Sequence, residues 1–239
     1  MPANSQRRRV YVGIVKDLFG VYYKLYHRLR VEGAEHIRTQ GPLFIIINHI
    51  SALEPFALGV ALADRGVLPG VHFWTVSKKE LFQFPPLAAF ISSLGMFPID
   101  RERFDLAAMR TLLNILREDK IIAVAPEGTR SPTGRLQAFQ PVVAKIAITR
   151  RVPILPAGAI GSENAMPIGA KFPHPEPITI RFGSIFELSE FYNVELTDEL
   201  ADRASWVMRA HVAELLPEWM RQVPPPSGRV GERRQKSER

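Results

Sequence analysis

The sequence contains no cysteine among its 239 residues. This absence excludes disulfide bonds, thiolate metal ligands and a cysteine acyl-enzyme, and it leaves the redox compartment undecided. The sequence also lacks a phosphate-binding loop, a Gly-x-Gly-x-x-Gly motif, a Gly-x-Ser-x-Gly elbow and paired histidines at a metal-binding spacing. Nucleotide binding by these loops, serine-hydrolase chemistry and a two-histidine metal site are therefore poor starting hypotheses.

Uninterrupted hydrophobic runs of membrane-spanning length are also scarce. The stretch from Leu81 to Ile99 has no charged residue and approaches the roughly 20 residues that a spanning helix needs. Polar and helix-breaking residues interrupt it, namely Gln83, Pro85, Pro86, Ser92, Ser93, Gly95 and Pro98. We therefore expect a short buried or membrane-facing helix near 86–94 and a short strand after it.

The composition is that of an ordinary globular protein, with 46% hydrophobic and 23% charged residues. The chain is long enough for one substantial α/β domain with a well-buried core. We place that domain at residues 32–221, after an N-terminal helical segment at 1–31. The remaining residues, 222–239, are predicted to form a disordered basic tail.

The formal net charge of +7 and the isoelectric point near 9.9 predict affinity for anions. Nucleic acid, anionic lipid headgroups and phosphorylated small molecules all qualify. Much of the excess charge lies in residues 7–9 and 229–239, where such side chains are most often only solvated. No basic recognition helix or aromatic stacking pattern is present, so we expect no nucleic-acid partner.

The N-terminal segment 7–31 shows helical periodicity. Apolar residues recur at steps of three to four, at Val10, Ile14, Leu18, Val21 or Tyr22, and Leu25. Four tyrosines, Phe19 and interspersed basic side chains resemble a helix that lies among lipid headgroups. A first helix packed on the domain is the alternative interpretation, and the two are compatible.

From Leu43 onward, short apolar runs alternate with helical stretches, which is typical of strands joined by crossover helices. Strands are predicted near 43–48, 71–76, 96–99, 120–125, 154–157 and 178–182. Helices are predicted near 55–64, 86–94, 105–118, 141–149 and 198–216. The pattern indicates an α/β fold with a central mixed, largely parallel sheet flanked by helices.

A histidine and a carboxylate follow the first predicted strand of this domain, at His49 and Glu54. On one helix, five residues rotate a side chain by about 500°, so the pair would lie on different faces. The two side chains can meet only if His49 lies in the loop and Glu54 at the following helix start. Pro55, a favourable first-turn residue, gives that geometry. A histidine held by a carboxylate is a general base near neutral pH.

A second interpretation of these residues stays open. Ser51-x-x-Glu54 also fits a capping box, in which Glu54 bonds to the backbone and not to His49. That arrangement puts Pro55 at the fourth helical position, where its ring is disfavoured. His49 taken alone also fits an ordinary structural histidine.

Two later loops each place an arginine just past a predicted strand. These loops contain Arg101 in one and Glu127, Gly128, Thr129 and Arg130 in the other. Arginine suits bidentate recognition of phosphate, and glycine lets the backbone approach closely. Because parallel strands end at one edge of a sheet, these loops and His49 are predicted to share a cleft. Ordinary surface ion pairs, Asp100 with Arg101 or Glu127 with Arg130, are the alternative.

Four blocks in this order resemble those of the glycerolipid acyltransferases, and of the lysophosphatidate acyltransferases in particular. They are Asn48-His49-x-Ser51-x-x-Glu54-Pro55, Gly95-Met96-Phe97-Pro98-Ile99-Asp100-Arg101, Pro126-Glu127-Gly128-Thr129-Arg130-Ser131 and Val152-Pro153-Ile154-Leu155-Pro156. The resemblance runs from Leu43 to about Phe182, over half of the chain. One block alone is a weak signal, whereas four in order are a strong one.

The resemblance implies an α/β acyltransferase domain at a membrane surface, peripheral or monotopic on the cytoplasmic face. It implies transfer of a fatty acyl group from acyl-coenzyme A or acyl-carrier protein to a lysophospholipid hydroxyl in phospholipid biosynthesis. The thioester is a co-substrate, and no cofactor, metal or covalent acyl-enzyme is implied.

The resemblance also implies roles for individual residues. His49 is the implied base that deprotonates the hydroxyl, and Glu54 is its orienting carboxylate. The implied glycerol-phosphate site contains Arg101, Glu127, Gly128, Thr129 and Arg130, with Lys78 as a further candidate.

Two departures from the family pattern leave alternatives open. The first block usually has Asp where this chain has Glu54, and a placement error of about 1 Å can cost roughly 10²-fold in rate. After the third block the family commonly has Phe-Lys-x-Gly, whereas this chain has Phe139-Gln140-Pro141-Val142. The alternatives are a related enzyme with another lipid acceptor, and a non-catalytic lipid-binding relative.

Overall fold

A computed structural model describes residues 2–101 and 105–221, with side chains from Val10 onward. Its seven-stranded sheet has the order β1-β7-β6-β2-β5-β3-β4. The strands are β1 (Arg30–Glu32), β2 (Leu43–Ile47), β3 (Phe73–Lys78), β4 (Met96–Ile99), β5 (Ile121–Val124), β6 (Ile154–Ile160) and β7 (Thr179–Phe182). All pairs are parallel except β6 with β7. The predicted mixed, largely parallel sheet is confirmed.

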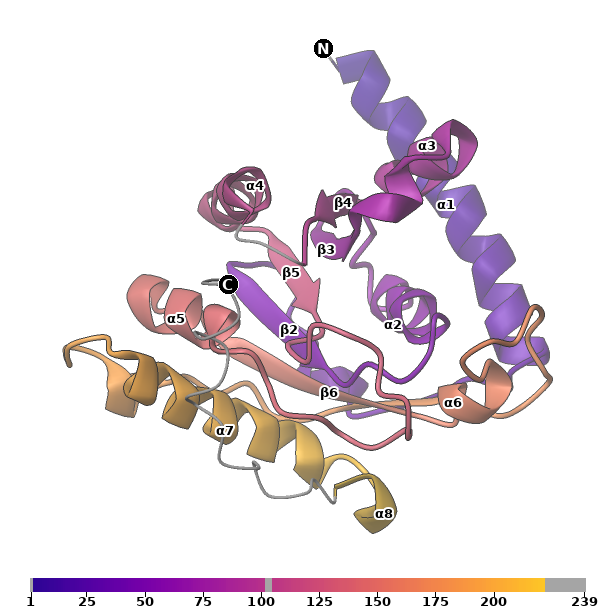
Figure 1. Ribbon diagram of the computed structural model, residues 1–239. Helices are drawn as coiled ribbons and strands as arrows, with labels where there is room; N and C mark the ends of the chain where they lie inside the picture. The colour runs from indigo at the N-terminus through magenta and orange to yellow at the C-terminus, as the bar shows by residue number, and fades with distance from the viewer. Residues whose placement is uncertain (1, 102–104, 222–239) are drawn as a thin grey trace, which may run out of the picture.

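Helices cover both faces of this sheet (Figure 1). They are α1 (Pro2–Leu25), α2 (Glu54–Ala63), α3 (Pro85–Ser93), α4 (Leu106–Arg117), α5 (Pro141–Arg150), α6 (Ser162–Ala165), α7 (Asp198–Glu214) and α8 (Glu218–Arg221). Short 3-10 turns lie at η1 (Ala34–His36), η2 (Lys79–Phe82) and η3 (Ser189–Phe191). In Figure 1, α1 and α2 lie on one side of the sheet, and α5 and α7 lie on the other.

The strand β2 lies at the centre of the core. All five of its residues are buried, between β5 on one side and β6 on the other. A strand covered by helices on both faces needs apolar side chains in both directions, which explains why Leu43–Ile47 is an unbroken apolar run. The polar residues that follow this run are therefore delivered to the carboxyl edge of the sheet.

The helix α1 carries apolar side chains on two faces. Val12 and Tyr23 are buried against the domain, and the Phe19 ring lies 5.5 Å from that of Phe56 in α2. The opposite face exposes 58–75% of Val10, Ile14, Leu18, Val21 and Leu25. Packing of α1 on the domain is thus confirmed. The apolar stripe identified from helical periodicity, however, points away from the domain. Among the described residues, no helix combines the length and apolar character needed to cross a bilayer.

The boundaries of the predicted elements agree with the structure to within about three residues, but two features differ at the N-terminal end. The helix α1 ends at Leu25, before the predicted limit at Val31, and β1 follows it. This three-residue strand has an exposed, intermediate, exposed pattern, so hydrophobic periodicity gives it little signal. The predicted tail, residues 222–239, lies outside the described residues.

Candidate active site

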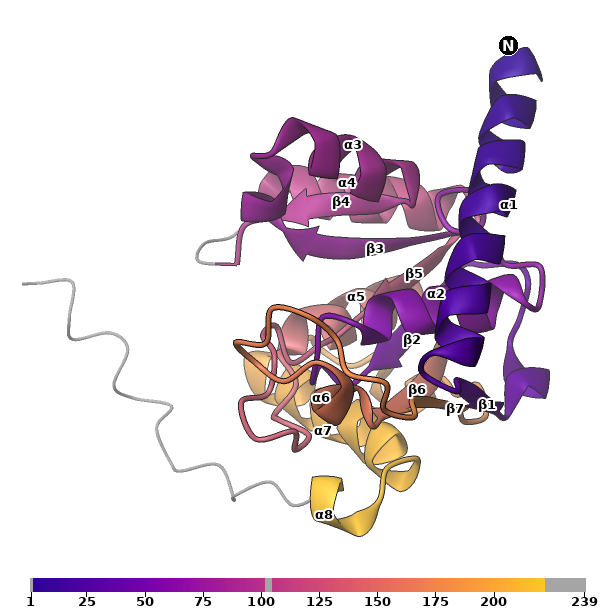
Figure 2. The ribbon, with the colours of Figure 1, turned by 90° about the vertical axis from the view of Figure 1, so that its right-hand side faces the viewer.

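The sequence-predicted polar loops meet at one edge of the sheet. The strands β2, β5, β3 and β4 are parallel neighbours, so the loops after them leave on the same side. Figure 2 shows the arrows of β3 and β4 pointing to this edge, on the left of the view. His49, Lys78, Arg101 and Glu127 follow or end these four strands. The predicted loops therefore lie at one edge of the sheet, although residues 127–130 do not line the cavity that contains His49.

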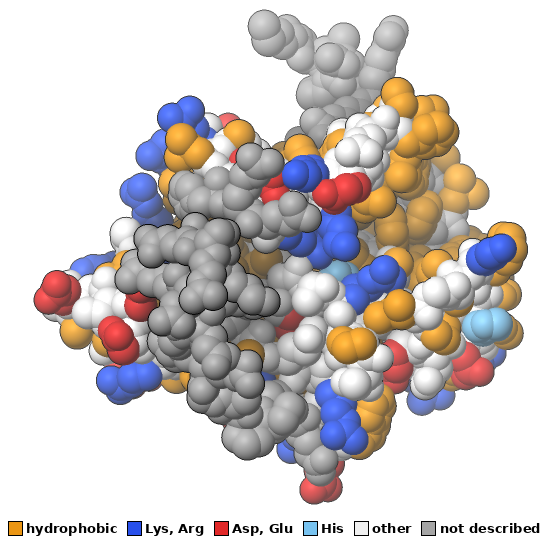
Figure 3. Space-filling view, viewed as in Figure 1, with side chains coloured by type: hydrophobic (Ala, Val, Ile, Leu, Met, Phe, Trp, Pro, Cys, Tyr) orange, Lys and Arg blue, Asp and Glu red, His pale blue; other side chains and the backbone are white. Residues whose placement is uncertain are grey.

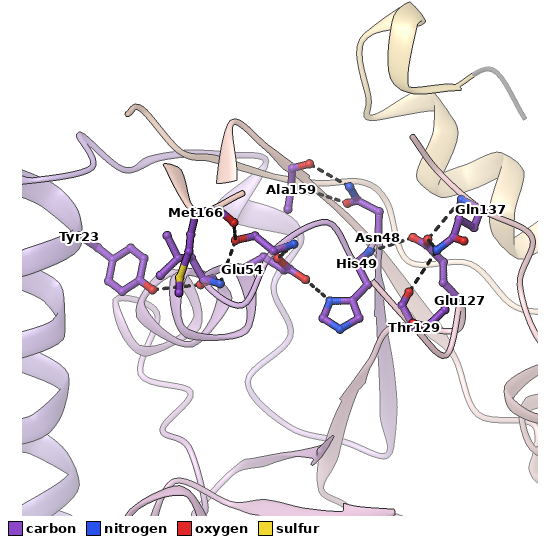
Figure 4. A network of polar contacts seen from close by, with 11 residues as sticks. Tyr23, Asn48, His49, Glu54, Glu127, Thr129, Gln137, Ala159 and Met166 are labelled. Atoms are coloured by element: carbon purple, nitrogen blue, oxygen red, sulfur yellow. Dashed lines mark hydrogen bonds and ion pairs between the residues drawn. The ribbon is translucent and has the colours of Figure 1, made fainter. Parts of the chain in front are cut away.

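The loop after β2 is fixed to β6 by Asn48. This side chain is fully buried, donates to the Ala159 carbonyl at 3.0 Å and accepts from the Ala159 N–H at 2.7 Å. The amide thereby continues the pairing of β2 with β6 past the end of the strand. His49 leaves the sheet from this fixed point and directs its ring toward α2 (Figure 4).

Glu54 uses its two carboxylate oxygens for two different partners. Oε1 bonds to Nδ1 of His49, and Oε2 accepts the Ser51 N–H at 2.7 Å. Glu54 is the first residue of α2, and Pro55 follows it in the first turn. The His–carboxylate pair and the backbone-capping contact are therefore both present, because each requires only one oxygen. The additional methylene of Glu does not prevent the carboxylate from reaching His49.

This geometry determines which imidazole nitrogen is available for chemistry. A carboxylate at Nδ1 favours a proton on that nitrogen, which leaves the Nε2 lone pair free to accept one. The Glu54 side chain is 1% exposed and that of His49 is 14% exposed, so water competes little for their contact. The pair is arranged as a general base with its orienting group.

The backbone of His49 is held from the other side by the loop after β5. Glu127 Oε1 accepts the His49 N–H at 2.8 Å, and the Ser131 N–H donates to the His49 carbonyl at 2.7 Å. Glu127 Oε2 accepts from the Gln137 backbone and side-chain amides, at 3.2 and 2.9 Å. Burial raises the pKa of Glu127, and the hydrogen bonds from His49 and Gln137 oppose that rise. All these contacts make Glu127 a support for His49.

The other predicted residues of this loop are nearer to solvent. Gly128 has a φ of +76°, a left-handed conformation that favours glycine, and Thr129 is exposed. The Thr129 carbonyl accepts from Gln137 Nε2 at 3.1 Å, and the Arg130 side chain is half-buried. A Cβ built on Gly128 would lie 3.6 Å from Gln140 Cγ, so Gln140 borders this loop.

A cavity brings His49, Glu54 and Arg101 together. Its wall also contains Thr75 and apolar residues from β2, α2, β3, β5 and the position after β5, namely Ile47, Pro55, Leu58, Phe73, Val76, Ala123, Val124 and Ala125. About 510 Å³ of empty space lies within the cavity and its open mouth together. Figure 3 shows Lys and Arg side chains gathered around a hollow near the centre of the view. Lys78 ends β3 at the same edge but does not line this cavity among the described residues.

Arg101 lines this cavity, and Arg130 is near enough to act on its charge. Partial loss of water lowers the pKa of Arg101, Glu80 opposes this, and the positive charge of Arg130 lowers it further. Two like charges that act on each other are stabilised by an anion between them, and arginine pairs well with phosphate oxygens. Asp105 holds the backbone just before Arg101, since its carboxylate accepts the N–H groups of Asp100 and of Ala108 at 2.9 Å each.

Two further contacts hold the loop between His49 and Glu54. Neither contact is predicted from the sequence. Tyr23 of α1 donates its hydroxyl to the Leu53 carbonyl at 3.0 Å, directly before Glu54. Burial raises the pKa of Tyr23, so this hydroxyl stays a donor. Ser51 Oγ donates to the Met166 carbonyl at 3.1 Å. Both partners are far away in the sequence, so no local motif reveals either contact.

Metal binding has no support in this geometry. Among residues 2–101 and 105–221, no group of three or more His, Asp or Glu side chains is arranged to hold a metal ion. The titratable groups that line the cavity are His49, Glu54 and Arg101. The class of protein is thus an α/β fold in which a His–carboxylate pair and one arginine line the same cavity.

Comparison with known proteins identifies the family. The family model described as Acyltransferase matches residues 28–160, more than half of the chain, and the protein belongs to this acyltransferase family. The predicted family resemblance is thereby confirmed. The matched range contains His49, Glu54, Arg101 and the loop from Glu127 to Arg130.

Several relatives are named 1-acyl-sn-glycerol-3-phosphate acyltransferases. A chloroplastic protein of Arabidopsis thaliana is 25% identical over 168 residues, which cover 69% of this chain and 45% of that protein. The Bacillus subtilis protein is 28% identical over 134 residues, covering 56% and 63%. The human beta enzyme is 30% identical over 140 residues, covering 56% and 48%. The chain therefore matches about half to two-thirds of the length of these relatives.

A solved structure shares the fold. The crystal structure of the 1-acyl-sn-glycerophosphate acyltransferase PlsC from Thermotoga maritima matches with a TM-score of 0.66 at 22% identity. The match covers 90% of this chain and 84% of that chain. The predicted fold class is thus confirmed by an independent structure.

The contact from Glu54 to His49 gives a first testable expectation. In Glu54→Gln, one oxygen is replaced by an NH₂ donor, so either the His49 Nδ1–H or the Ser51 N–H loses its acceptor. We expect acyl transfer to fall by about 10²–10⁴-fold. Initial-rate assays with the Glu54→Asp variant as the control test this, since Asp keeps both oxygens and is expected to keep much of the rate. Equal rates for Glu and Gln would show that only the capping contact matters.

The position of Glu127 gives a second expectation. In Glu127→Gln, one oxygen becomes an NH₂ group that faces either the His49 N–H or the Gln137 donors, which leaves partly buried N–H groups without an acceptor. The free energy of unfolding should fall by about 1–3 kcal/mol. The kcat of acyl transfer should fall while the KM for the acceptor stays nearly constant, because His49 is displaced. Denaturant unfolding and steady-state kinetics measure these two effects. A change confined to KM would instead support the predicted role of Glu127 in phosphate binding.

Proposed function

We propose that this protein transfers a fatty acyl group from acyl-coenzyme A or acyl-carrier protein to the free hydroxyl of a lysophosphatidate-like glycerolipid, in phospholipid biosynthesis. The observation that carries the proposal is the shared cavity of His49, Glu54 and Arg101. This cavity combines a base for a hydroxyl with a cation for a phosphate. The names of the relatives support the same acceptor.

The proposed mechanism uses His49 as a general base. Nε2 takes the proton of the acceptor hydroxyl as its oxygen attacks the thioester carbonyl carbon. The tetrahedral intermediate collapses with loss of the thiolate, which receives the proton back from the imidazolium of His49. Glu54 stabilises that imidazolium and holds the ring in place. No covalent acyl-enzyme forms on this route.

Arg101 and Arg130 are the proposed ligands of the acceptor phosphate, with Gly128, Thr129 and Lys78 as neighbours at the same edge. The mutual repulsion of the two arginines favours a dianion between them. Glu127 contributes indirectly, through the bond from its carboxylate to the His49 N–H.

An apolar cavity beside the catalytic one supports a long acyl chain as the transferred group. It shares Pro55, Phe73 and Thr75 with the catalytic cavity, so the two are neighbours across one wall. Its other lining residues come from α1, α2, the loops before β3 and β4, and the start of β4, and are Val15, Lys16, Phe19, Phe56, Gly59, Val60, Ala63, Pro69, Leu94 and Met96. Burial of methylene groups there would contribute about 0.8 kcal/mol each.

We also propose a peripheral position on the cytoplasmic face of a membrane, as the substrate of such a reaction is a membrane lipid. The exposed stripe of α1 from Val10 to Leu25 supports this position. An apolar stripe of this kind suits the boundary between headgroups and acyl chains.

A different phosphate-free or glycolipid acceptor is the second candidate. It is favoured by Gln140, which borders Gly128 at the point where the family commonly has Lys. The third candidate, a non-catalytic relative, loses its main support because Glu54 does contact His49.

A rate assay with an acceptor panel tests the proposed function. Acyl-coenzyme A and lysophosphatidate should give phosphatidate, and His49→Ala should lower this rate by at least about 10³-fold. Arg101→Ala should raise the KM for lysophosphatidate and leave that for monoacylglycerol unchanged, while Gln140→Lys should lower the KM for lysophosphatidate. Transfer unaffected by His49→Ala would contradict the mechanism. A preference for acceptors without phosphate would support the second candidate.

The apolar cavity gives an expectation for acyl-chain length. A Cβ at Gly59 meets only Phe73 Cζ, at 3.8 Å, so a longer side chain there projects into the cavity. In Gly59→Met, the preference for long over short acyl donors should fall about tenfold or more, as displaced methylenes lose about 0.8 kcal/mol each. Competition assays with donors of two lengths measure this. Gly59→Ala is the control, since its methyl fits, and an unchanged preference in Gly59→Met would exclude this cavity.

A further inference from the structure

The segment 166–177 connects α6 to β7 and carries two large apolar side chains at its tip. Ile168 is 52% exposed and Phe172 is 78% exposed. The tip is a closed turn, in which Ala170 N–H donates to the Pro167 carbonyl and His174 N–H donates to the Ala165 carbonyl at 2.7 Å. These bonds hold the apolar tip outward instead of letting it fold back on the core.

The same segment is attached to the C-terminal end of α1. Tyr26 donates its hydroxyl to the Pro173 carbonyl at 3.0 Å, and Arg28 donates to the Pro175 carbonyl at 2.6 Å. The buried ring of His27 contacts the Glu176 carbonyl at 3.1 Å. In Figure 1 the segment and this end of α1 reach the same right-hand edge of the molecule. The segment that carries the apolar tip is therefore fixed next to the end of α1 where the exposed stripe ends.

We infer that the tip of segment 166–177 is a second membrane-contact site, which inserts Ile168 and Phe172 among the lipid headgroups beside α1. The inference rests on the proposed function, because a membrane-lipid substrate makes a lipid bilayer the partner of this tip.

A bilayer fits this surface by shape and by charge. The apolar side chains protrude along a helix and from a turn, which suits a fluid lipid layer better than a shaped protein groove. Lys171 is exposed beside Phe172, and Arg28, which bonds to the segment, is exposed as well. Anionic headgroups would meet these charges while the apolar tips insert.

The second contact would also set the distance between the bilayer and the loop that carries His49 and Glu54. Segment 166–177 begins at Met166, whose carbonyl accepts Ser51 Oγ at 3.1 Å. Ser51 in turn donates its N–H to Glu54. A tip anchored in lipid would thus be connected through Met166, Ser51 and Glu54 to His49, the base that takes the proton of the acceptor hydroxyl.

The absence of cysteine permits a direct test by site-specific labelling. Phe172→Cys carries a nitroxide on the full-length protein, with Leu18→Cys on α1 and Val194→Cys as matched positions. Val194 is 53% exposed and precedes α7, whose N-terminal end lies at the opposite edge in Figure 1. When the protein binds vesicles of phosphatidylcholine and phosphatidylglycerol, the nitroxides at positions 172 and 18 should become accessible to oxygen. The same nitroxides should be protected from a water-soluble nickel complex. Position 194 should stay aqueous. A label at 172 that stays aqueous while the protein is vesicle-bound would overturn the inference.

Vesicle affinity gives a second readout. The double variant Ile168→Ser/Phe172→Ser should bind these vesicles about tenfold more weakly than the unmodified protein, while Val194→Ser/Leu196→Ser binds unchanged. Acyl transfer to a short-chain, water-soluble lysophosphatidate should be equal in all three proteins. Equal vesicle affinity of the three proteins would contradict the contact site.

The outcomes for the contact site and for the proposed function are separate. Acyl transfer with an aqueous label at position 172 leaves the function standing and removes the contact site. A lipid-inserted label without acyl transfer supports the contact site and removes the function.

Discussion

The two oxygens of Glu54 are the constraint on which the site depends. One oxygen orients His49 through Nδ1, and the other closes the loop by accepting the Ser51 N–H. Both contacts require α2 to begin at Glu54, which Pro55 in the first turn favours. The positive end of the α2 dipole adds to the stabilisation of the carboxylate.

Three distant parts of the chain hold this loop in place. Glu127 fixes the His49 backbone, Tyr23 of α1 holds the Leu53 carbonyl, and Met166 accepts the Ser51 hydroxyl. A fourth partner, Arg209 of α7, donates to the carbonyls of Leu136 and Gln137, next to the amides that Glu127 accepts. The positioning of the base is therefore a property of the whole fold. The same α1 that holds Leu53 presents the exposed apolar stripe, so the proposed membrane contact and the support of the loop before Glu54 share one helix.

Much of the fold and the central pair of the site are predictable from the sequence, because their signals are local. The apolar run Leu43–Ile47 marks a buried strand, and Pro55 marks the helix start that brings Glu54 to His49. The common edge of the parallel strands then places Arg101 near the pair. Long-range contacts are not predictable in this way. The inward direction of Glu127, the bond from Tyr23 to Leu53 and the outward direction of the α1 stripe depend on residues that meet only after folding.

The protonation of the His49 ring tests the central claim most directly. If Glu54 orients the base, the neutral ring carries its proton on Nδ1 and leaves Nε2 free. Nitrogen-15 NMR of labelled protein, with the His49 signals assigned by comparison with His49→Ala, distinguishes the two tautomers. We predict an Nδ1–H signal shifted downfield by the carboxylate and lost in Glu54→Gln. A neutral ring with its proton on Nε2 would contradict the assignment of His49 as the base for the acceptor hydroxyl.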